Sequence, residues 1–215
     1  MGTESAPAQF ALLSRILHWL MAVMLLTMLF IGVTMVASLG NYHALVAVHR
    51  PLGILILILA VVRLFNRVFT TLPPFPPTMS PRERWLASAS EKLLYTLMIA
   101  LPLVGWGMLS AGNYPIIMLG PLHLPPILPT HPMLYAGLRK AHTLLAFLLF
   151  LTFLAHLSAV LFHTLIIRDR LLDRMALWPT HRQMHTHDED ASTSTGPSNI
   201  LPNENHRRST SDLRR

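Results

Sequence analysis

Four histidines in apolar surroundings are the residues of this 215-residue chain best suited to chemistry. They are His18, His49, His142 and His156. Burying an ionisable side chain in an apolar environment costs several kcal/mol, so each of them needs a partner or a role. Neutral imidazole binds transition metals, and histidine can pass protons near neutral pH. The chain has no Cys, which excludes disulfides, iron–sulfur clusters and covalently attached c-type haem.

The composition indicates where these histidines reside. Hydrophobic residues make up 52% of the chain and charged residues 13%, which is too apolar for an ordinary soluble domain. Crossing the hydrocarbon core of a membrane takes about 20 apolar residues. Four segments approach that length, roughly 12–39, 44–65, 93–110 and 141–167. The sequence therefore predicts an all-α integral membrane four-helix bundle in one domain, residues 1–178.

The basic residues predict the orientation of this bundle. One set of connections carries Arg15, Arg63, Arg67, Arg82, Arg84, Lys92, Arg168, Arg170 and Arg174, and the opposite set carries Arg50, Arg139 and Lys140. Cytoplasmic loops of membrane proteins are enriched in Lys and Arg, so both termini are expected to be cytoplasmic. The net charge of +7 is thus explained by lipid headgroups, and nucleic acid is not an expected partner.

The segments outside the spans differ in character. Residues 66–85 contain five Pro, which favours an extended, polyproline-like spacer. The outer connection 111–138 has six Pro and no Asp, Glu, Lys or Arg, and it is expected to pack along the bilayer surface or over the bundle. Residues 179–215 have too little apolar surface to offset the entropy of folding, so a disordered cytoplasmic tail is predicted there.

The topology predicts which histidines can meet. His18 lies near the cytoplasmic end of the first helix, and His49 lies near the outer end of the second. His142 lies near the outer end of the fourth helix, and His156 lies about 21 Å further in, at a rise of 1.5 Å per residue. Two pairs result, His49 with His142 and His18 with His156, and each can hold one six-coordinate haem iron. The alternative is that all four are hydrogen-bonded interior histidines that stabilise the bundle.

Several motifs carry a resemblance to a known family. In order, they are RILHWLMA, VHRPLG followed by VVRLFNR, LYTLMIALPLVGWGMLSAGNYP, and RDRLLDRM. Over about residues 10–178 the chain resembles the bacterial cytochrome b561 family. The resemblance implies a multi-pass protein of the bacterial inner membrane that carries two haem b groups and exchanges electrons with quinone. It also implies the same four histidines as haem ligands.

Cations flank the proposed ligands. Arg50, Arg139 and Lys140 lie next to His49 and His142, where they can pair with haem propionates or attract a small anion. Arg15 lies three residues before His18, within reach of a propionate of the inner haem.

His163 is the predicted proton-transfer residue. It follows His156 by seven residues, which is about two turns toward the cytoplasm on the same helix face. There it could donate a hydrogen bond to a quinone and pass protons. The alternative places its ring tip among the lipid headgroups.

Three functions remain open on this reading. The first is electron transfer between the periplasmic face and the quinone pool; some members of the family oxidise superoxide at the outer face and reduce ubiquinone. The second is a cytochrome b subunit that relays electrons between quinone and a partner dehydrogenase. The third is a membrane scaffold whose histidines are structural.

Overall fold

Long helices dominate the computed structural model, which describes residues 9–70, 73–75, 79–118, 123–168 and 171–177. The helices are α1 (Leu12–Ala37), α2 (Tyr42–Phe69), α3 (Pro81–Ala111) and α4 (Pro132–Phe162), with short helical turns η1 (Leu39–Asn41), η2 (His163–Ile167) and η3 (Leu171–Arg174). Each of the four long helices is long and apolar enough to cross a membrane. The predicted all-α membrane bundle is confirmed, and the predicted tail, 179–215, lies outside the described residues.

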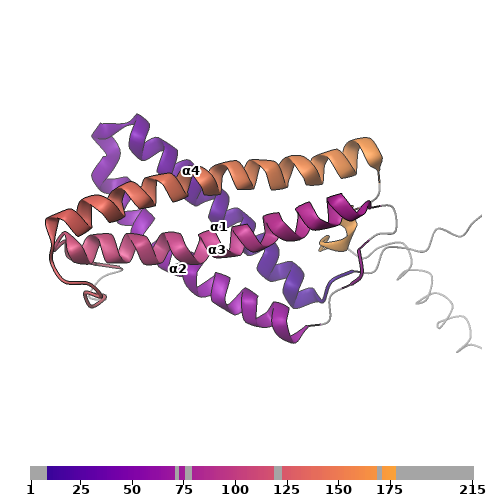
Figure 1. Ribbon diagram of the computed structural model, residues 1–215, viewed down its shortest axis with the longest axis horizontal. Helices are drawn as coiled ribbons and strands as arrows, with labels where there is room; N and C mark the ends of the chain where they lie inside the picture. Colours follow the sequence, from indigo (N-terminus) through magenta and orange to yellow (C-terminus); the bar gives the residue numbers. More distant parts are fainter. Residues whose placement is uncertain (1–8, 71–72, 76–78, 119–122, 169–170, 178–215) are drawn as a thin grey trace, which may run out of the picture. The chain divides into compact units, whose positions relative to one another are not determined.

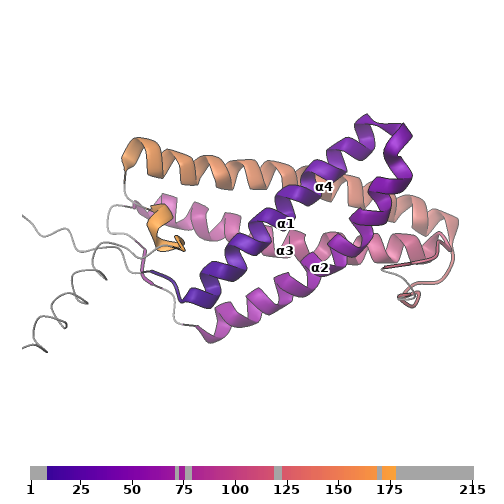
Figure 2. The same cartoon turned by 180° about the vertical axis from the view of Figure 1, so that it is seen from behind.

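Successive helices run in opposite directions (Figure 1). The start of α1, the end of α2, the start of α3 and the end of α4 share one end of the bundle, which we call the linker end. The α1–α2 turn and the α3–α4 connection share the other, which we call the loop end. α1 packs on α2, α2 on α3 and α3 on α4, so that the pair α1 and α2 covers the pair α3 and α4 (Figure 2).

All four long helices contribute to one apolar core. The core consists of Met21, Met24, Leu25, Ile56, Ala60, Tyr95, Leu97, Met98, Leu101 and Leu149. The outward surface is also apolar; Phe30 and Val36, for example, are 74% and 85% exposed. An apolar outer surface around an apolar core is what a helix bundle in lipid requires.

Helix α3 begins earlier than hydropathy alone suggests. Ser80 and Glu83 form a capping box, in which the Ser80 hydroxyl accepts from the Glu83 amide at 3.3 Å and the Glu83 carboxylate accepts from the Ser80 amide at 2.7 Å. Pro81 occupies the first helical position, where its missing N–H costs nothing. The predicted spacer 66–85 is therefore wrong at both ends, because α2 continues through Phe69.

Helix α4 also starts before its predicted span, at Pro132. The ring Nδ1 of His131 accepts from the Leu134 amide at 3.4 Å and caps the helix. The connection before it packs against the end of α3: the Trp106 indole donates to the Pro125 carbonyl at 2.9 Å. This part of the connection thus packs over the bundle, which is one of the two arrangements expected from the sequence.

Residues 171–177, which we call the clamp, bind the start of α1 at the linker end. The Gln9 amide, the Phe10 backbone, the Arg15 guanidinium and the Trp19 indole donate to the carbonyls of Asp173, Arg174, Ala176 and Met175, respectively, at 2.7 to 3.1 Å. Arg174 is buried, and this burial lowers the pKa of its guanidinium. Its Nη2 donates to the Pro74 carbonyl at 2.6 Å, so the clamp joins α1 to the α2–α3 linker.

Replacing Arg174 tests whether the clamp contributes to stability. Arg174→Met removes the bond to Pro74 and the contact of the guanidinium with the Phe10 ring, 5.7 Å from Cζ to the ring centre. The expected loss is roughly 1–3 kcal/mol, seen as a lower melting temperature in detergent. Arg82→Met, at an exposed position, should melt with the parent. Equal melting temperatures for all three proteins would contradict a stabilising clamp.

Candidate cofactor site

The structure brings His49 of α2 and His142 of α4 together at the loop end. Their ring centres are 6.2 Å apart and the ring planes are inclined by 65°. Two imidazoles bound to one metal ion from opposite sides have ring centres about 6 Å apart, because each metal–nitrogen bond is about 2 Å long. The observed separation therefore fits two axial ligands of a single iron.

His18 of α1 and His156 of α4 form the second pair. The two rings interact electrostatically, and both are within electrostatic range of Arg63 on α2. His18 also meets the Trp19 ring edge-on, with 6.0 Å between centres. The structure thus brings the His49 and His142 rings together and places His18 within electrostatic range of His156, and the pairing of these residues as haem ligands stays a prediction.

The buried ring nitrogens distinguish the two roles considered for these histidines. The Nδ1 atoms of His18 and His49 are buried and have no hydrogen-bond partner among the described residues, whereas the His142 ring lies within hydrogen-bonding range of the Leu101 backbone. A buried polar atom without a partner costs about 1–3 kcal/mol. Histidines that stabilise the bundle by hydrogen bonds would avoid this cost. The arrangement instead suits rings reserved for a ligand outside the chain, and two neutral imidazoles per pair suit a six-coordinate haem iron.

Gly105 of α3 allows the close approach of His142. A Cβ atom at this position would lie 3.3 Å from Cε1 and 3.5 Å from Nδ1 of the His142 ring. Sequence analysis did not single out Gly105. The available signal is a glycine inside an apolar helix, which costs about 0.5–1 kcal/mol relative to Ala and is kept where something lies close to the backbone.

The four cations predicted to pair with haem propionates differ in their contacts. Arg50 donates to the Pro115 carbonyl at 3.2 Å. Arg139 and Lys140 are exposed, and neither side chain has a hydrogen-bond or ion-pair partner in the described part of the chain. Arg15 instead belongs to the clamp contact, although its Nε is buried and finds no partner among the described residues. Pairing of these cations with propionates stays a prediction.

His163 lies at the start of the π-helical turn that follows α4. Its side chain is 8% exposed, its ring meets Phe162 edge-on, and it is within electrostatic range of Glu83 on α3. The hydroxyl of Thr164 beside it is buried without a hydrogen-bond partner among the described residues. Single π-helical turns are frequent at functional sites. Burial of the ring favours a role within the bundle over contact with headgroups.

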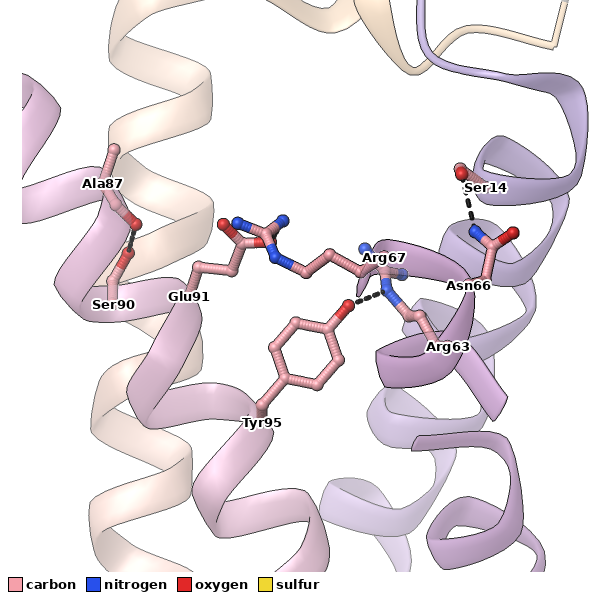
Figure 3. Close-up of polar contacts among 8 residues, drawn as sticks. All are labelled: Ser14, Arg63, Asn66, Arg67, Ala87, Ser90, Glu91 and Tyr95. Atoms are coloured by element: carbon pink, nitrogen blue, oxygen red, sulfur yellow. Dashed lines mark hydrogen bonds and ion pairs between the residues drawn. The ribbon is translucent and has the colours of Figure 1, made fainter. Parts of the chain in front are cut away.

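A polar cluster at the linker end escaped the sequence analysis, which treated its arginines only as topology signals. The Arg63 Nε donates to the Tyr95 hydroxyl at 2.7 Å, and Asn66 donates to the Ser14 hydroxyl at 2.7 Å (Figure 3). Arg67 forms an ion pair with Glu91. The signal that could have found the cluster is Arg63 itself, which lies inside an apolar span four residues before Arg67.

The fold and the paired histidines together define a multi-pass membrane protein suited to b-type haem. The sequence profile of the prokaryotic cytochrome b561 family matches residues 9–177, and the chain belongs to this family. It is 30% identical over 179 residues to cytochrome b561 homolog 2 of Escherichia coli (strain K12), a match that covers 81% of this chain and 95% of that protein. It is 31% identical over 128 residues to the probable superoxide oxidase CybB of Yersinia pestis, covering 60% of this chain and 72% of that protein.

Family membership confirms the resemblance and several of the expectations attached to it. The chain is a haem b protein of membrane electron transfer, and its four membrane-spanning helices place it in the bacterial inner membrane as a multi-pass protein. The number of haems, the ligands, the quinone and the direction of electron flow belong to the proposal below.

Gly105→Ala tests the site without touching a ligand. The added methyl presses on the His142 ring, and overpacking of this kind costs about 1–3 kcal/mol. If His49 and His142 bind haem, as proposed below, we expect a changed haem spectrum and a lower haem content, with any haem held by His18 and His156 retained. Gly137→Ala is the matched control, because a Cβ there meets nothing within 4 Å. Unchanged low-temperature haem spectra for Gly105→Ala would contradict the site at His142.

Proposed function

We propose that the chain is an inner-membrane di-haem b protein that carries electrons between the periplasmic face and the quinone pool. The observation that carries the proposal is the pairing of both α4 histidines with histidines of other helices. His142 and His156 are 14 residues apart, so the two pairs lie about 21 Å apart along α4. Haem bound at each pair supplies one-electron iron chemistry.

The ligand pairs restrict what the protein can do. Two imidazoles saturate the axial positions of an iron, which favours electron transfer over oxygen binding. His49 with His142 would hold the haem at the loop end, and His18 with His156 the haem at the linker end. The greater number of cations at the linker end supports a cytoplasmic position for it, which leaves the loop end facing the periplasm.

Superoxide is the electron donor that the loop end suits best. Arg50, Arg139 and Lys140 flank the histidine pair there, and the sequence has no Asp or Glu between residues 92 and 168. A positive surface without acids attracts a small anion. Two superoxide ions give up one electron each and leave as dioxygen, and one ubiquinone takes up two electrons and two protons. The Yersinia pestis relative is named a probable superoxide oxidase, which supports the same reaction.

The second candidate is a cytochrome b subunit that relays electrons between quinone and a partner dehydrogenase. The observation in its favour is the same exposed Arg139 and Lys140, which suit an acidic protein surface as well as a small anion. The two candidates differ in whether the isolated chain reacts with superoxide.

Stopped-flow spectroscopy of the purified protein separates these functions. We expect rapid haem reduction after a pulse of superoxide, followed by reoxidation that depends on added ubiquinone. Haem that reacts with quinol but not with superoxide would support the relay subunit. A protein without a Soret band after expression with sufficient haem would exclude both electron-transfer functions.

His163 is proposed to act at the quinone step. It is the next titratable side chain beyond His156 along α4, and its burial keeps it inside the bundle. A quinone that accepts electrons near His156 needs a hydrogen-bond donor and a route for its two protons, and an imidazole can supply both.

His163→Ala should keep both haems and their reduction by superoxide, because neither ligand pair is changed. Reoxidation by quinone should slow by roughly ten- to several-hundred-fold, as expected when a hydrogen bond of about 1.5 to 3 kcal/mol and a proton-transfer group are lost together. His43→Ala, exposed at the loop end, should reoxidise at the parent rate. A slow His43 variant with an unaffected His163 variant would place the quinone at the loop end.

A further inference from the structure

Arg63 is a cation inside a membrane-spanning helix, and it has no carboxylate partner among the residues that the structure describes. Its side chain is half-buried, its Nε donates to the Tyr95 hydroxyl at 2.7 Å, and its Cζ lies 5.7 Å from the centre of the Tyr95 ring. Within the described part of the chain no Asp or Glu pairs with it, because the nearby Glu91 is bonded to Arg67. A charge in such a position needs a compensating group.

The described residues around Arg63 offer no other negative charge to compensate it. Both His18 and His156 are within its electrostatic range. These are the two residues proposed to hold the haem at the linker end, and bound ferric iron adds positive charge there. An anion is therefore the missing component of this part of the molecule.

A small cavity beside Arg63 has room for such an anion. It measures about 30 Å³, and its lining combines the apolar side chains of Phe10 and Met175 with polar residues. Those of α1, α2 and α3 are Ser14, Arg63, Asn66, Arg67, Glu91 and Tyr95 (Figure 3). About 10–15 Å³ of such volume already admits one water molecule, so the cavity suits a water or a carboxylate group and cannot enclose a quinone ring. Two guanidinium groups against one carboxylate give its lining a surplus of one positive charge.

We propose that Arg63 and Tyr95 bind one carboxylate at the linker end. The guanidinium has N–H groups left after its bond to Tyr95, and it provides a charge-assisted hydrogen bond. The Tyr95 oxygen accepts from Arg63, so its own hydrogen remains available to donate to the same anion. The carboxylate comes from a propionate of the haem at His18 and His156, which rests on the proposed function, or from a dissolved anion.

This site influences the midpoint potential of the neighbouring haem. A fixed cation favours the addition of an electron, and a fixed carboxylate opposes it. With Arg63 present the two charges offset each other. Without it the carboxylate faces the haem uncompensated, and the midpoint potential falls.

Spectroelectrochemical titration of the holoprotein measures this effect. The linker-end haem is identified as the one missing from His18→Ala. Arg63→Gln should lower its midpoint potential by an amount that corresponds to at least a tenfold change in the reduction equilibrium, about 59 mV for one electron. Arg63→Lys keeps the charge and should shift it far less, and Arg82→Gln, an exposed cation at the same end, should not shift it. An unmoved potential in Arg63→Gln with both haems bound, together with a parent potential that does not depend on acetate, overturns the proposal.

Two further measurements complete the test. If Arg63→Gln fails to hold the linker-end haem, Arg63→Lys decides: retention at the parent potential supports the site, and loss overturns it. Exchanging chloride for acetate at constant ionic strength separates the sources, because only a dissolved carboxylate makes the parent potential depend on acetate. A parent protein with fewer than two haems per chain counts against the proposed function, whereas two haems with an unmoved potential count against the Arg63 site alone.

Discussion

Buried imidazole rings whose Nδ1 atoms find no hydrogen-bond partner among the described residues are the constraint on which this structure depends. His18 and His49 both have such an Nδ1. In lipid, water is not present to compensate, so the folded chain alone bears a cost of about 1–3 kcal/mol per atom. A group that binds these rings would also link the helices that carry them. In the proposed function, cofactor binding would therefore stabilise the bundle.

The alternation of helix direction determines how many histidine pairs the bundle can form. Because α1 and α2 run in opposite directions, His18 and His49 fall at opposite ends of the bundle, although both helices lie in the same layer. Helix α4 is long enough to present a partner to each, and its 14-residue spacing returns His142 and His156 to one face. A glycine in α3 leaves room for one of these rings. Antiparallel packing therefore converts four separate residues into two sites.

The spans could be predicted from the sequence because they follow from hydropathy. The histidine pairs could be predicted because they follow from the depth of each histidine in its span. The starts of α3 and α4 could not be predicted, since Pro81 and Pro132 look like breaks until Ser80 and His131 are seen to cap the helices. The clamp could not be predicted from the sequence for a different reason. Its bonds run from side chains at the start of α1 to backbone carbonyls about 160 residues later, and carbonyls carry no sequence signature. Arg63 was predicted only as one of the cytoplasmic cations. That no described carboxylate pairs with it follows from the ion pair between Glu91 and Arg67, which the sequence does not reveal.

The two ends of the bundle differ in the acidic residues that accompany their cations, and this difference bears on the proposed entry of electrons. At the linker end Arg15, Arg67 and Arg174 are bonded to carbonyls or to a carboxylate, and the clamp covers the start of α1. At the loop end Arg139 and Lys140 are exposed, and the described residues offer them no partner. Exposed cations retain a field that reaches about 8–10 Å into solution. At the loop end no acidic residue of the described chain offsets this field, whereas the linker end carries Glu83, Glu91 and Asp173 beside exposed cations such as Arg82. In the proposed function, the loop end would therefore collect an anionic donor from solution, and the linker end would hold fixed charges around a membrane-soluble acceptor.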